Sequence, residues 1–455
     1  MSDRPLRVAV VGSGPAGFYA ASALLTADPP AEVDMIERLP TPWGLVRLGV
    51  APDHPKLKDV SRAFERVAHR PGFRFFGNVE LGTSITHDDL TQLYDAVIYA
   101  VGAQTDNRLG VPGEDLPGSW SATQFVAWYN GHPDFQDLEF DLSGERAVVV
   151  GAGNVALDVA RMLALTPEEL APTDTTDRAI DAIADSGIRE IVLLARRGPA
   201  QAAFTTPELK ELGELAGADI VVDPADLELD DASAASIVGN TNATRNIEVL
   251  REFATREPAG KLRRVVLHFL VAPVAIVGED AVEGVEIVHN ELVAEGERIS
   301  ARATDRRETI PAGVVFRSVG YRGVALPGLP FDQARGTLLN GGGRVLDESG
   351  APIAGVYCAG WIKRGPTGVI GTNKKDATET VQLLLEDAAA GRLPRTSERR
   401  DLAQVLAERG GDPVLYADWE EINRIEKAAG EPRGRPRVKL CSWEALLAAA
   451  RPDPS

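Results

Sequence analysis

Two short glycine-rich segments could bind phosphate groups. The first reads Gly12-Ser-Gly-Pro-Ala-Gly17, and the second reads Gly151-Ala-Gly-Asn-Val-Ala156. Each follows an apolar run that predicts a buried strand and precedes an apolar run that predicts a helix. In such a unit Gly12 permits a tight turn, Gly14 lets the backbone approach a pyrophosphate, and Gly17 lets the helix pack on the strand. Because a helix N-terminus also attracts phosphates, the two segments predict two dinucleotide-binding sites.

The residue that ends the next predicted strand distinguishes the two sites. After Val33–Ile36 comes Glu37, 20 residues beyond the last glycine of the first loop, where an acid holds a ribose hydroxyl. After Ile191–Leu194 the chain instead carries Arg196 and Arg197. Guanidinium groups can pair with a 2′-phosphate that an acid would repel, so the second nucleotide is expected to be NADP. A solvated strand end is the simpler alternative for the arginine pair.

These loops require two Rossmann-like units. The second loop tolerates Ala156 in place of a third glycine, but more than 40 residues separate it from the arginine pair, so an extra helix is expected near 176–184. Strands at Ala96–Val101 and Val314–Val319 close the two units. The expected fold is therefore α/β, with an NADP-binding domain at residues 107–320 inserted into an FAD-binding domain at residues 1–106 and 321–455.

Composition sets further limits. The 455 residues are too many for one core, and 44% hydrophobic with 25% charged residues is typical of a globular protein. No apolar run approaches the roughly 18 residues of a membrane span and no signal peptide opens the chain, so a cytoplasmic protein with no membrane contact is expected. The net charge of −19 argues against nucleic-acid binding. Cys358 and Cys441 form no Cys-x-x-Cys pair, so neither a disulfide, a metal site nor a dithiol centre is indicated.

Several longer segments together carry a family resemblance that runs nearly end to end. They are Leu39-Pro-Thr-Pro-Trp-Gly-Leu-Val-Arg47, Gly49-Val-Ala-Pro-Asp-His-Pro-Lys56, Arg196-Arg-Gly-Pro199, Phe204-Thr-Thr206 and the run from Gly360 to Lys375. On these segments the chain resembles the adrenodoxin reductase-like ferredoxin–NADP reductases, in particular the actinobacterial NADPH-ferredoxin reductases. The resemblance implies that NADPH passes a hydride to FAD, which then passes single electrons to a ferredoxin-type iron–sulfur protein.

The resemblance also implies the cofactor contacts. The FAD set, including the loop glycines, is Gly12, Gly14, Ala16, Gly17, Glu37, Leu45, Leu81, Trp361, Gly368, Val369 and Ile370. The NADP set is Asn107, Arg108, Gly151, Ala152, Gly153, Asn154, Val155, Arg196, Arg197, Glu208 and Gly368. The chain departs from the family at one position, where Asn107 replaces an arginine and Arg108 follows it, so Arg108 either takes over that contact or the site does without it. Trp361 has core packing as its simpler alternative.

Few residues are expected to act as acids or bases. By resemblance, His54 and Glu211 are the candidates for passing protons or positioning the nicotinamide, since a histidine titrates near neutral pH and a carboxylate can orient it. The alternative for His54 is a structural role in its loop, next to Asp53 and Pro55.

A locally basic stretch in this acidic chain could bind an acidic ferredoxin. Its members are Arg245, Arg251, Arg256, Lys261, Arg263 and Arg264. Complementary charge there would steer the encounter, although a solvated surface with mixed charge explains the stretch equally well.

Other functions are open to a chain that binds both nucleotides. Disulfide reductases need a cysteine pair near the flavin, and proteins like the glutamate synthase small subunit carry N-terminal cysteines, but none precedes Cys358 here. A reductase with another acceptor, such as a quinone, oxygen or a monooxygenase substrate, stays open. So does a nucleotide sensor without turnover.

Overall fold

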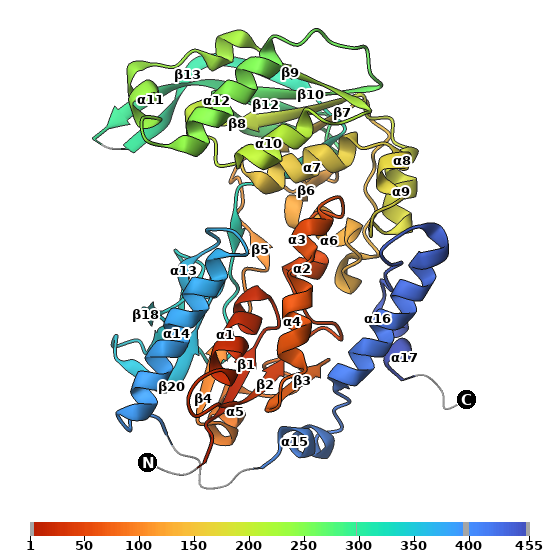
Figure 1. Cartoon of the computed structure of the whole chain (residues 1–455). Coiled ribbons are helices and arrows are strands. Elements are labelled where there is room, and N and C mark those ends of the chain that lie inside the picture. The colour runs from red at the N-terminus through yellow and green to blue at the C-terminus, as the bar shows by residue number, and fades with distance from the viewer. Residues whose placement is uncertain (1–3, 297, 395–399, 452–455) are drawn as a thin grey trace. The chain divides into compact units, whose positions relative to one another are not determined.

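The computed structural model describes residues 4–296, 298–394 and 400–451 (Figure 1). The chain divides into two compact units. The first comprises the chain up to Thr105, the segment Gly131–Asp134 and the chain from Tyr321 onward, and the second comprises Asp106–Asn130 and Phe135–Gly320. The two outer crossings lie beside the boundaries expected at 106/107 and 320/321. The return of the chain to the first unit at 131–134 has no counterpart among the sequence predictions.

The first unit is built on a sheet to which its described residues contribute eight strands, in the order β18-β19-β20-β4-β1-β2-β3-β21. The five strands from β20 to β3 are parallel, which is the arrangement predicted for a dinucleotide-binding unit. The strands are β1 Arg7–Val11, β2 Glu32–Ile36, β3 Phe73–Gly77, β4 Ala96–Tyr99, β18 Asn340–Gly341, β19 Arg344–Leu346, β20 Pro352–Cys358 and β21 Val414–Leu415.

Helices cover both faces of this sheet. The longer ones are α1 Pro15–Leu25, α4 Ser61–Ala68, α5 His87–Leu93, α14 Thr372–Ala389, α15 Leu402–Glu408, α16 Tyr416–Gly430 and α17 Trp443–Ala450. Figure 1 shows α1 and α14 side by side, although more than 300 residues separate them in the chain. Three short helices, α2 Leu45–Leu48, α3 Pro55–Lys58 and α13 Trp361–Arg364, begin at or directly after candidate site residues.

Strand β1 shows why the sheet is buried on both sides. Val8 and Val10 pack in one apolar cluster with α1 and α14, whereas Ala9 and Val11 pack in another with α5 and α15. Successive side chains of a strand point to opposite faces, so a continuous apolar run is what a strand covered by helices on both faces requires.

The second unit contains two sheets. Its described residues form a parallel sheet in the order β6-β14-β7-β8-β10-β9 and an antiparallel sheet in the order β11-β12-β13. The strands are β6 Ser119–Ser121, β7 Arg146–Val150, β8 Glu190–Ala195, β9 Ala218–Val222, β10 Arg263–Phe269, β11 Val271–Val277, β12 Gly284–Glu295, β13 Arg298–Pro311 and β14 Val314–Arg317. The helices are α6 Ala122–Tyr129, α7 Asn154–Ala164, α8 Pro167–Leu170, α9 Asp177–Ala184, α10 Thr206–Leu212, α11 Asp231–Ser236 and α12 Thr241–Ala254.

The long crossover after the second glycine loop contains the helix that the sequence predicts. Helix α9 starts after Thr176, whose side chain accepts a hydrogen bond from the N–H of Ala179. The shorter helix α8 precedes it, with Thr166 and Glu169 forming a capping box. Within the described ranges, no helix combines the length and the apolar character needed to cross a membrane.

Candidate functional site

The first glycine loop, between β1 and α1, contains glycines of two kinds. Gly12 has φ of +103°, and a Cβ there would lie 2.6 Å from the Ala100 carbonyl oxygen. A Cβ on Gly17 would lie 2.0 Å from the carbonyl oxygen of Gly12. A Cβ on Gly14, in contrast, would meet nothing within 4 Å. Gly12 and Gly17 are therefore required by packing, whereas Gly14 leaves open space for a pyrophosphate to approach the backbone.

Glu37, the residue that follows β2, lies against this loop. Its carboxylate accepts hydrogen bonds from the backbone N–H of Ser13 at 3.0 Å and from the Ser13 hydroxyl at 2.7 Å. The other oxygen accepts from the N–H of Leu39 at 3.1 Å. A carboxylate has about four lone-pair sites, so Glu37 can hold the loop and still accept a ribose hydroxyl.

Two segments that are distant in the sequence pack against the same loop. The N–H of Trp43 donates to the Ser13 carbonyl at 3.0 Å, and a Cβ on Gly44 would lie only 2.9 Å from the Gly14 Cα. From the other end of the chain, a Cβ on Gly360 would lie 2.7 Å from the Ala16 Cβ. The residues next to these contacts are the predicted flavin neighbours: Leu45, an exposed leucine that begins α2, and Trp361, which begins α13.

Trp361 offers a donor that its unit does not use. Its indole Nε1 is buried and has no hydrogen-bond partner among the described residues. Asp376 holds the turn before it, accepting from the N–H of Gly360 at 2.5 Å and from Lys363 at 3.1 Å. An unpartnered buried N–H beside an open glycine loop fits a planar polar cofactor such as FAD.

The remaining predicted flavin contacts lie in loops of the first unit. Gly368 has φ of +81°, which favours glycine, and it precedes Val369 and Ile370 just before α14 begins. The side chain of Val369 is exposed. Leu81 forms a bridge with Ile85 after β3 and is partly buried.

The second glycine loop, between β7 and α7, also contains one glycine required by packing and one beside open space. Gly151 has φ of +143°, and a Cβ there would lie 2.2 Å from the Ser318 carbonyl oxygen, whereas a Cβ on Gly153 would meet nothing within 4 Å. The Asn154 side chain accepts from the N–H of Thr205 at 2.8 Å, and the Ala152 carbonyl accepts from Ala203 at 2.8 Å. Val155 follows in the first turn of α7. The loop is thus anchored by its neighbours and open at its middle glycine.

Arg196 and Arg197 follow β8 directly, and both are exposed. Their backbone is held by the strands of the second sheet, because Asn290 donates to the Arg196 carbonyl at 2.9 Å and the N–H of Leu270 donates to the Arg197 carbonyl at 3.3 Å. A fixed backbone with solvent-accessible guanidinium groups suits the binding of a 2′-phosphate.

A buried arginine that the sequence analysis missed organises the predicted glutamates of the second unit. Arg161 of α7 is 2% exposed and lies 2.8 Å from Asp158, 3.5 Å from Glu208 and 3.6 Å from Glu211. Its position in an otherwise apolar stretch of helix was the available signal. Because Glu208 and Glu211 share a buried cation, α10 is fixed against α7.

His54 belongs to the first unit. It is buried, precedes α3, and donates its backbone N–H to the Ala51 carbonyl at 3.0 Å. Its carbonyl accepts from Leu57 at 3.1 Å. The backbone of His54 therefore supports its loop, and its pairing with Glu211 stays a prediction.

The structure contradicts the expected surface position of Arg263 and shows which contacts Arg108 makes. Arg263 is wrong as a surface docking residue, because it starts an internal strand, is 4% exposed and donates to backbone carbonyls such as those of Leu163 and Ile183. Burial lowers its pKa.

Arg108 is exposed, but it is already paired: both its contacts to the Asp115 carboxylate are 2.6 Å. The side-chain amide of the neighbouring Asn107 donates to the carbonyl of Val319.

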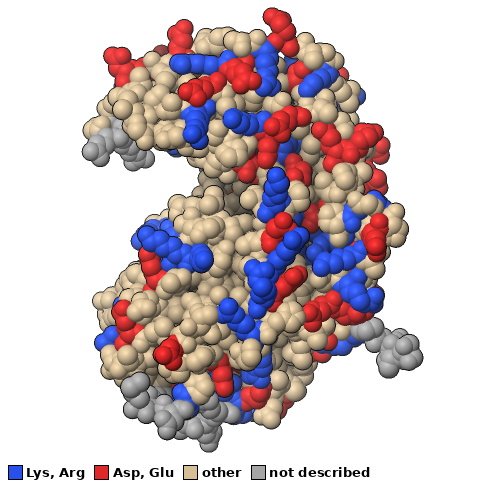
Figure 2. All heavy atoms as spheres, viewed as in Figure 1, with Lys and Arg blue, Asp and Glu red and all other residues tan. Residues whose placement is uncertain are grey.

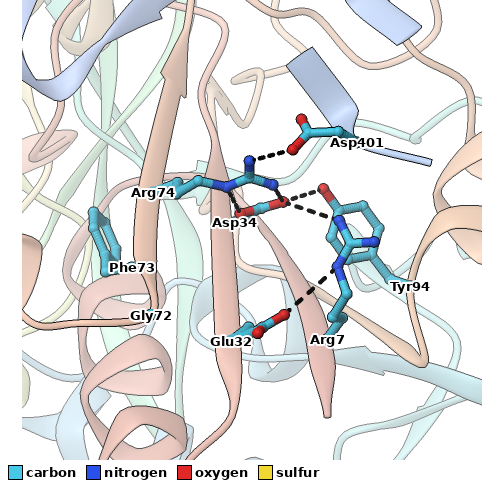
Figure 3. A pocket seen from close by; sticks show the side chains of 8 residues that line it. All are labelled: Arg7, Glu32, Asp34, Gly72, Phe73, Arg74, Tyr94 and Asp401. Carbon is cyan, nitrogen blue, oxygen red and sulfur yellow. Dashed lines mark hydrogen bonds and ion pairs between the residues drawn. The ribbon is translucent and has the colours of Figure 1, made fainter. Parts of the chain in front are cut away.

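A cavity at the opposite edge of the first unit's sheet does not belong to the nucleotide site. It lies at the amino ends of β1, β2 and β3, and its charged residues pair with one another (Figure 3). The buried Asp34 accepts from Arg74 at 2.6 Å and from the Tyr94 hydroxyl at 2.6 Å, and Arg7 lies 3.7 Å away. Asp401 binds Arg74 at 2.7 Å. This network ties α15 to the sheet, and its role is structural.

Neither cysteine provides disulfide chemistry. Both are free thiols, and burial raises the pKa of Cys358 to about 12. Since the thiolate is the reactive form, Cys358 is inert at neutral pH.

Comparison with known proteins is consistent with this pair of loops. A model of the pyridine nucleotide-disulphide oxidoreductase family matches residues 6–197. The NADPH-ferredoxin reductase FprA of Mycobacterium tuberculosis is 52% identical, covering 98% of this chain and 99% of the relative. The mitochondrial NADPH:adrenodoxin oxidoreductase of Arabidopsis thaliana is 41% identical, covering 99% of this chain and 96% of the relative. The structure of M. tuberculosis FprA in complex with NADPH superimposes with a TM-score of 0.93 at 51% identity, covering 98% of this chain and all of that one.

Proposed function

Because this chain belongs to the NADPH-ferredoxin reductase family, we propose that it transfers electrons from NADPH through FAD to a ferredoxin-type iron–sulfur protein. It is an oxidoreductase of the pyridine nucleotide-dependent flavoprotein type. The proposal rests chiefly on the glycine loop that occurs in both units. In each loop a packed glycine with positive φ, Gly12 or Gly151, is followed two residues later by a glycine beside open space, Gly14 or Gly153.

The first unit binds FAD in this proposal. The residues involved are Gly12, Gly14, Ala16, Gly17, Glu37, Leu45, Leu81, Trp361, Gly368, Val369 and Ile370. Gly14 admits the pyrophosphate, Glu37 accepts from a ribose hydroxyl, and the free indole N–H of Trp361 donates to the cofactor. When bound, FAD would accept two electrons as a hydride and pass them on one at a time.

The second unit binds NADPH in this proposal. The residues involved are Asn107, Arg108, Gly151, Ala152, Gly153, Asn154, Val155, Arg196, Arg197 and Glu208, together with Gly368 of the first unit. Gly153 admits the pyrophosphate, and the exposed Arg196 and Arg197 pair with the 2′-phosphate. Arg108 binds Asp115 through one guanidinium nitrogen, and its other N–H groups are proposed to reach a phosphate.

The function is tested by adding NADPH anaerobically to the purified chain and then supplying a ferredoxin with cytochrome c as the terminal reporter. We expect flavin bleaching at about one equivalent, as a two-electron donor requires, and cytochrome reduction that depends on the ferredoxin. Bleaching without ferredoxin dependence would point to a quinone, oxygen or other acceptor. Absence of bleaching would favour a nucleotide sensor.

We further propose that His54 and Glu211 position the nicotinamide or pass protons. The histidine lies in a loop that its own backbone supports, and Glu211 is held by Arg161. His54→Ala is expected to slow flavin reduction by NADPH in a stopped-flow experiment by about 100-fold or more, the lower end of general acid–base effects. His69→Ala, which alters an exposed histidine, is the control. An unchanged rate in His54→Ala would leave His54 with a structural role only.

The docking surface for ferredoxin is proposed on the exposed members of the basic stretch, now without Arg263. These are Arg245, Arg251, Arg256, Lys261 and Arg264. Over the face drawn in Figure 2 basic and acidic side chains are interspersed, so complementary charge would act locally and be weakened by salt.

Charge reversal tests this surface. Arg245→Glu with Arg251→Glu should raise the KM for ferredoxin about tenfold at low salt and leave flavin reduction by NADPH unchanged. Arg302→Glu is the matched control, since Arg302 is also exposed in the second unit but pairs with Glu291 on β12. Equal effects of the two reversals would rule out this docking surface.

A further inference from the structure

Two histidines and a glutamate converge on neighbouring strands of the second unit. His268 lies on β10, His289 on β12 and Glu308 on β13, and one ligand atom of each lies within 4.8 Å of the others. The Nε2 of His289 is 2.8 Å from a carboxylate oxygen of Glu308, and the two imidazole rings are 5.7 Å apart. His268 and His289 are partly exposed, so an ion from solvent can reach them.

The backbone around this cluster departs from regular strand geometry. The β12–β13 pairing shifts between Val288 and Asn290, so His289 stands opposite three residues of β13 instead of one. The Thr304 side chain closes this bulge by donating to the His289 carbonyl at 2.7 Å. Bulges redirect side chains and are frequent beside functional sites. Glu308 itself lies in the regular part of the pairing, opposite Ile287, and is a diagonal neighbour of His289.

The donor set favours a transition metal. Two imidazole nitrogens and a carboxylate suit Zn²⁺ and its neighbours, whereas Mg²⁺ and Ca²⁺ prefer oxygen ligands alone. A tetrahedral Zn²⁺ with bonds of about 2.0–2.2 Å separates its ligand atoms by about 3.4 Å. His289 Nε2 and the Glu308 oxygen are 2.8 Å apart, so this pair would open slightly to admit the ion. Asp226, which accepts from the N–H of Phe269 at 3.0 Å, interacts electrostatically with both histidines and adds a second carboxylate.

We propose that His268, His289 and Glu308 bind a divalent transition-metal ion of the Zn²⁺ class, with water in the fourth position. A bound ion would hold β10, β12 and β13 together at one point. Such a site links β10 of the parallel sheet to the paired strands β12 and β13 of the antiparallel sheet.

The site adjoins the segment that supports the arginine pair. Leu270, two residues after His268, donates to the Arg197 carbonyl, and Asn290, next to His289, donates to the Arg196 carbonyl. A bound ion would therefore limit the motion of the backbone that carries both guanidinium groups. This consequence, a lower KM for NADPH with metal bound, rests on the proposed function of the arginines, whereas metal binding itself does not.

Calorimetric titration of ZnCl₂ into the chelator-treated, FAD-loaded full chain tests the site. We expect one equivalent to bind, and His268→Asn or His289→Asn to weaken it at least tenfold. His69→Asn is the matched control, because His69 pairs with Glu420 at 3.0 Å but lies in no three-residue cluster found among the described residues. The retained FAD absorbance reports that each variant is folded.

The outcomes separate the two parts of the inference. Absence of binding, or equal binding by wild type and both histidine variants, overturns the metal site. Metal binding that leaves the KM for NADPH unchanged overturns the coupling to Arg196 and Arg197. Absence of reductase activity in the wild-type chain would contradict the proposed function, but it would not affect the conclusion about metal binding.

Discussion

Each nucleotide-binding loop contains glycine for two physical reasons. Gly12 and Gly151 adopt positive φ and lie so close to a carbonyl oxygen that a side chain has no room. Gly14 and Gly153 meet no neighbouring atoms, so their lack of a side chain serves an approaching ligand and not the packing of the protein. We therefore expect substitution of the first pair to damage the fold and substitution of the second pair to damage nucleotide binding.

The arginine pair makes a prediction at the scale of single residues. Arg196→Ala with Arg197→Ala should raise the KM for NADPH by about 10- to 100-fold, since each charge-assisted hydrogen bond is worth about 1.5–3 kcal/mol and the variant loses only part of that total. The KM for NADH should change little, because NADH has no 2′-phosphate. Steady-state kinetics with both nucleotides measures this. Equal losses for NADPH and NADH would contradict the 2′-phosphate assignment.

Sequence reasoning located side chains well where the chemistry is local. Glu37 lies against the first glycine loop, and Arg196 and Arg197 follow their strand as predicted. It failed for Arg263, because the charge of an arginine suggests a surface position. In the structure five backbone and hydroxyl acceptors satisfy its guanidinium inside the second unit. Such acceptors come from segments far away in the chain.

At the scale of elements, helix α16 anchors a segment that lies against the first glycine loop. Glu426 of α16 is fully buried and binds Arg47 of α2 at 2.5 and 2.8 Å and Arg437 at 3.1 Å. Burial alone would raise the pKa of Glu426, but the two arginines lower it. Trp419 of the same helix packs edge-on against Trp43, which precedes α2. Helix α16 therefore holds the segment in which a Cβ on Gly44 would press against Gly14.

Breaking this buried ion pair should be costly. Glu426→Gln leaves the buried Arg47 and the partly exposed Arg437 without their counter-charge, and we expect about 3–5 kcal/mol loss in the free energy of unfolding. It should also release FAD more readily, because α2 is no longer held. Thermal unfolding and FAD fluorescence measure the two effects.

A second glutamate of the same helix provides the control. Glu421 pairs with Arg424 at the surface, so Glu421→Gln should cost less than about 1 kcal/mol. Similar losses in the two variants would show that the buried pair contributes no more than the surface pair.

The elements themselves were largely predictable, but their long-range contacts were not. Apolar runs beside the glycine loops located both strand–loop–helix units, and the length of the second crossover predicted helix α9. The Arg47–Glu426 pair joins residues 379 positions apart, and the first unit's sheet receives β20 from beyond the second unit. Periodicity reports the local period of burial and carries no information about which distant segment covers a given face.

At the scale of the whole molecule, the chain passes between its two units more often than a single insertion requires. The segment Gly131–Asp134 belongs to the first unit. Asp134 binds Arg38 at 2.5 Å and the indole N–H of Trp443 at 2.7 Å. Next to it, burial lowers the pKa of His132 to about 4, against a smaller opposing effect of Asp134.

This histidine predicts a dependence of stability on pH. The unfolded chain binds a proton at His132 near pH 6.5 and the folded chain only near pH 4, so between these values the unfolded state holds more protons. Stability should therefore fall as the pH falls through this window, by up to about 3 kcal/mol from this residue. His132→Asn keeps an acceptor for the N–H of Asp134 and should reduce the loss of thermal stability between pH 7 and about pH 5.

An exposed histidine gives the opposite sign and serves as the control. The pKa of His69 is raised, mainly by its hydrogen bond to the Glu65 backbone and also by Glu420. Its contribution is present at low pH and is lost as the pH rises, so His69→Asn should not protect against acid. A pH profile identical in wild type and His132→Asn would exclude His132 as a source of the acid sensitivity.

The sheet order of the first unit has a consequence for synthesis on the ribosome. Strand β4 pairs with β20, which ends at Cys358, and β3 pairs with β21, which ends at Leu415. When translation reaches residue 105, the nascent first unit therefore has two unpaired strand edges, and it keeps them while the whole second unit is made. The second unit can therefore finish folding before the first unit, although the first unit begins to emerge from the ribosome earlier. Chaperone protection would be needed most during that interval.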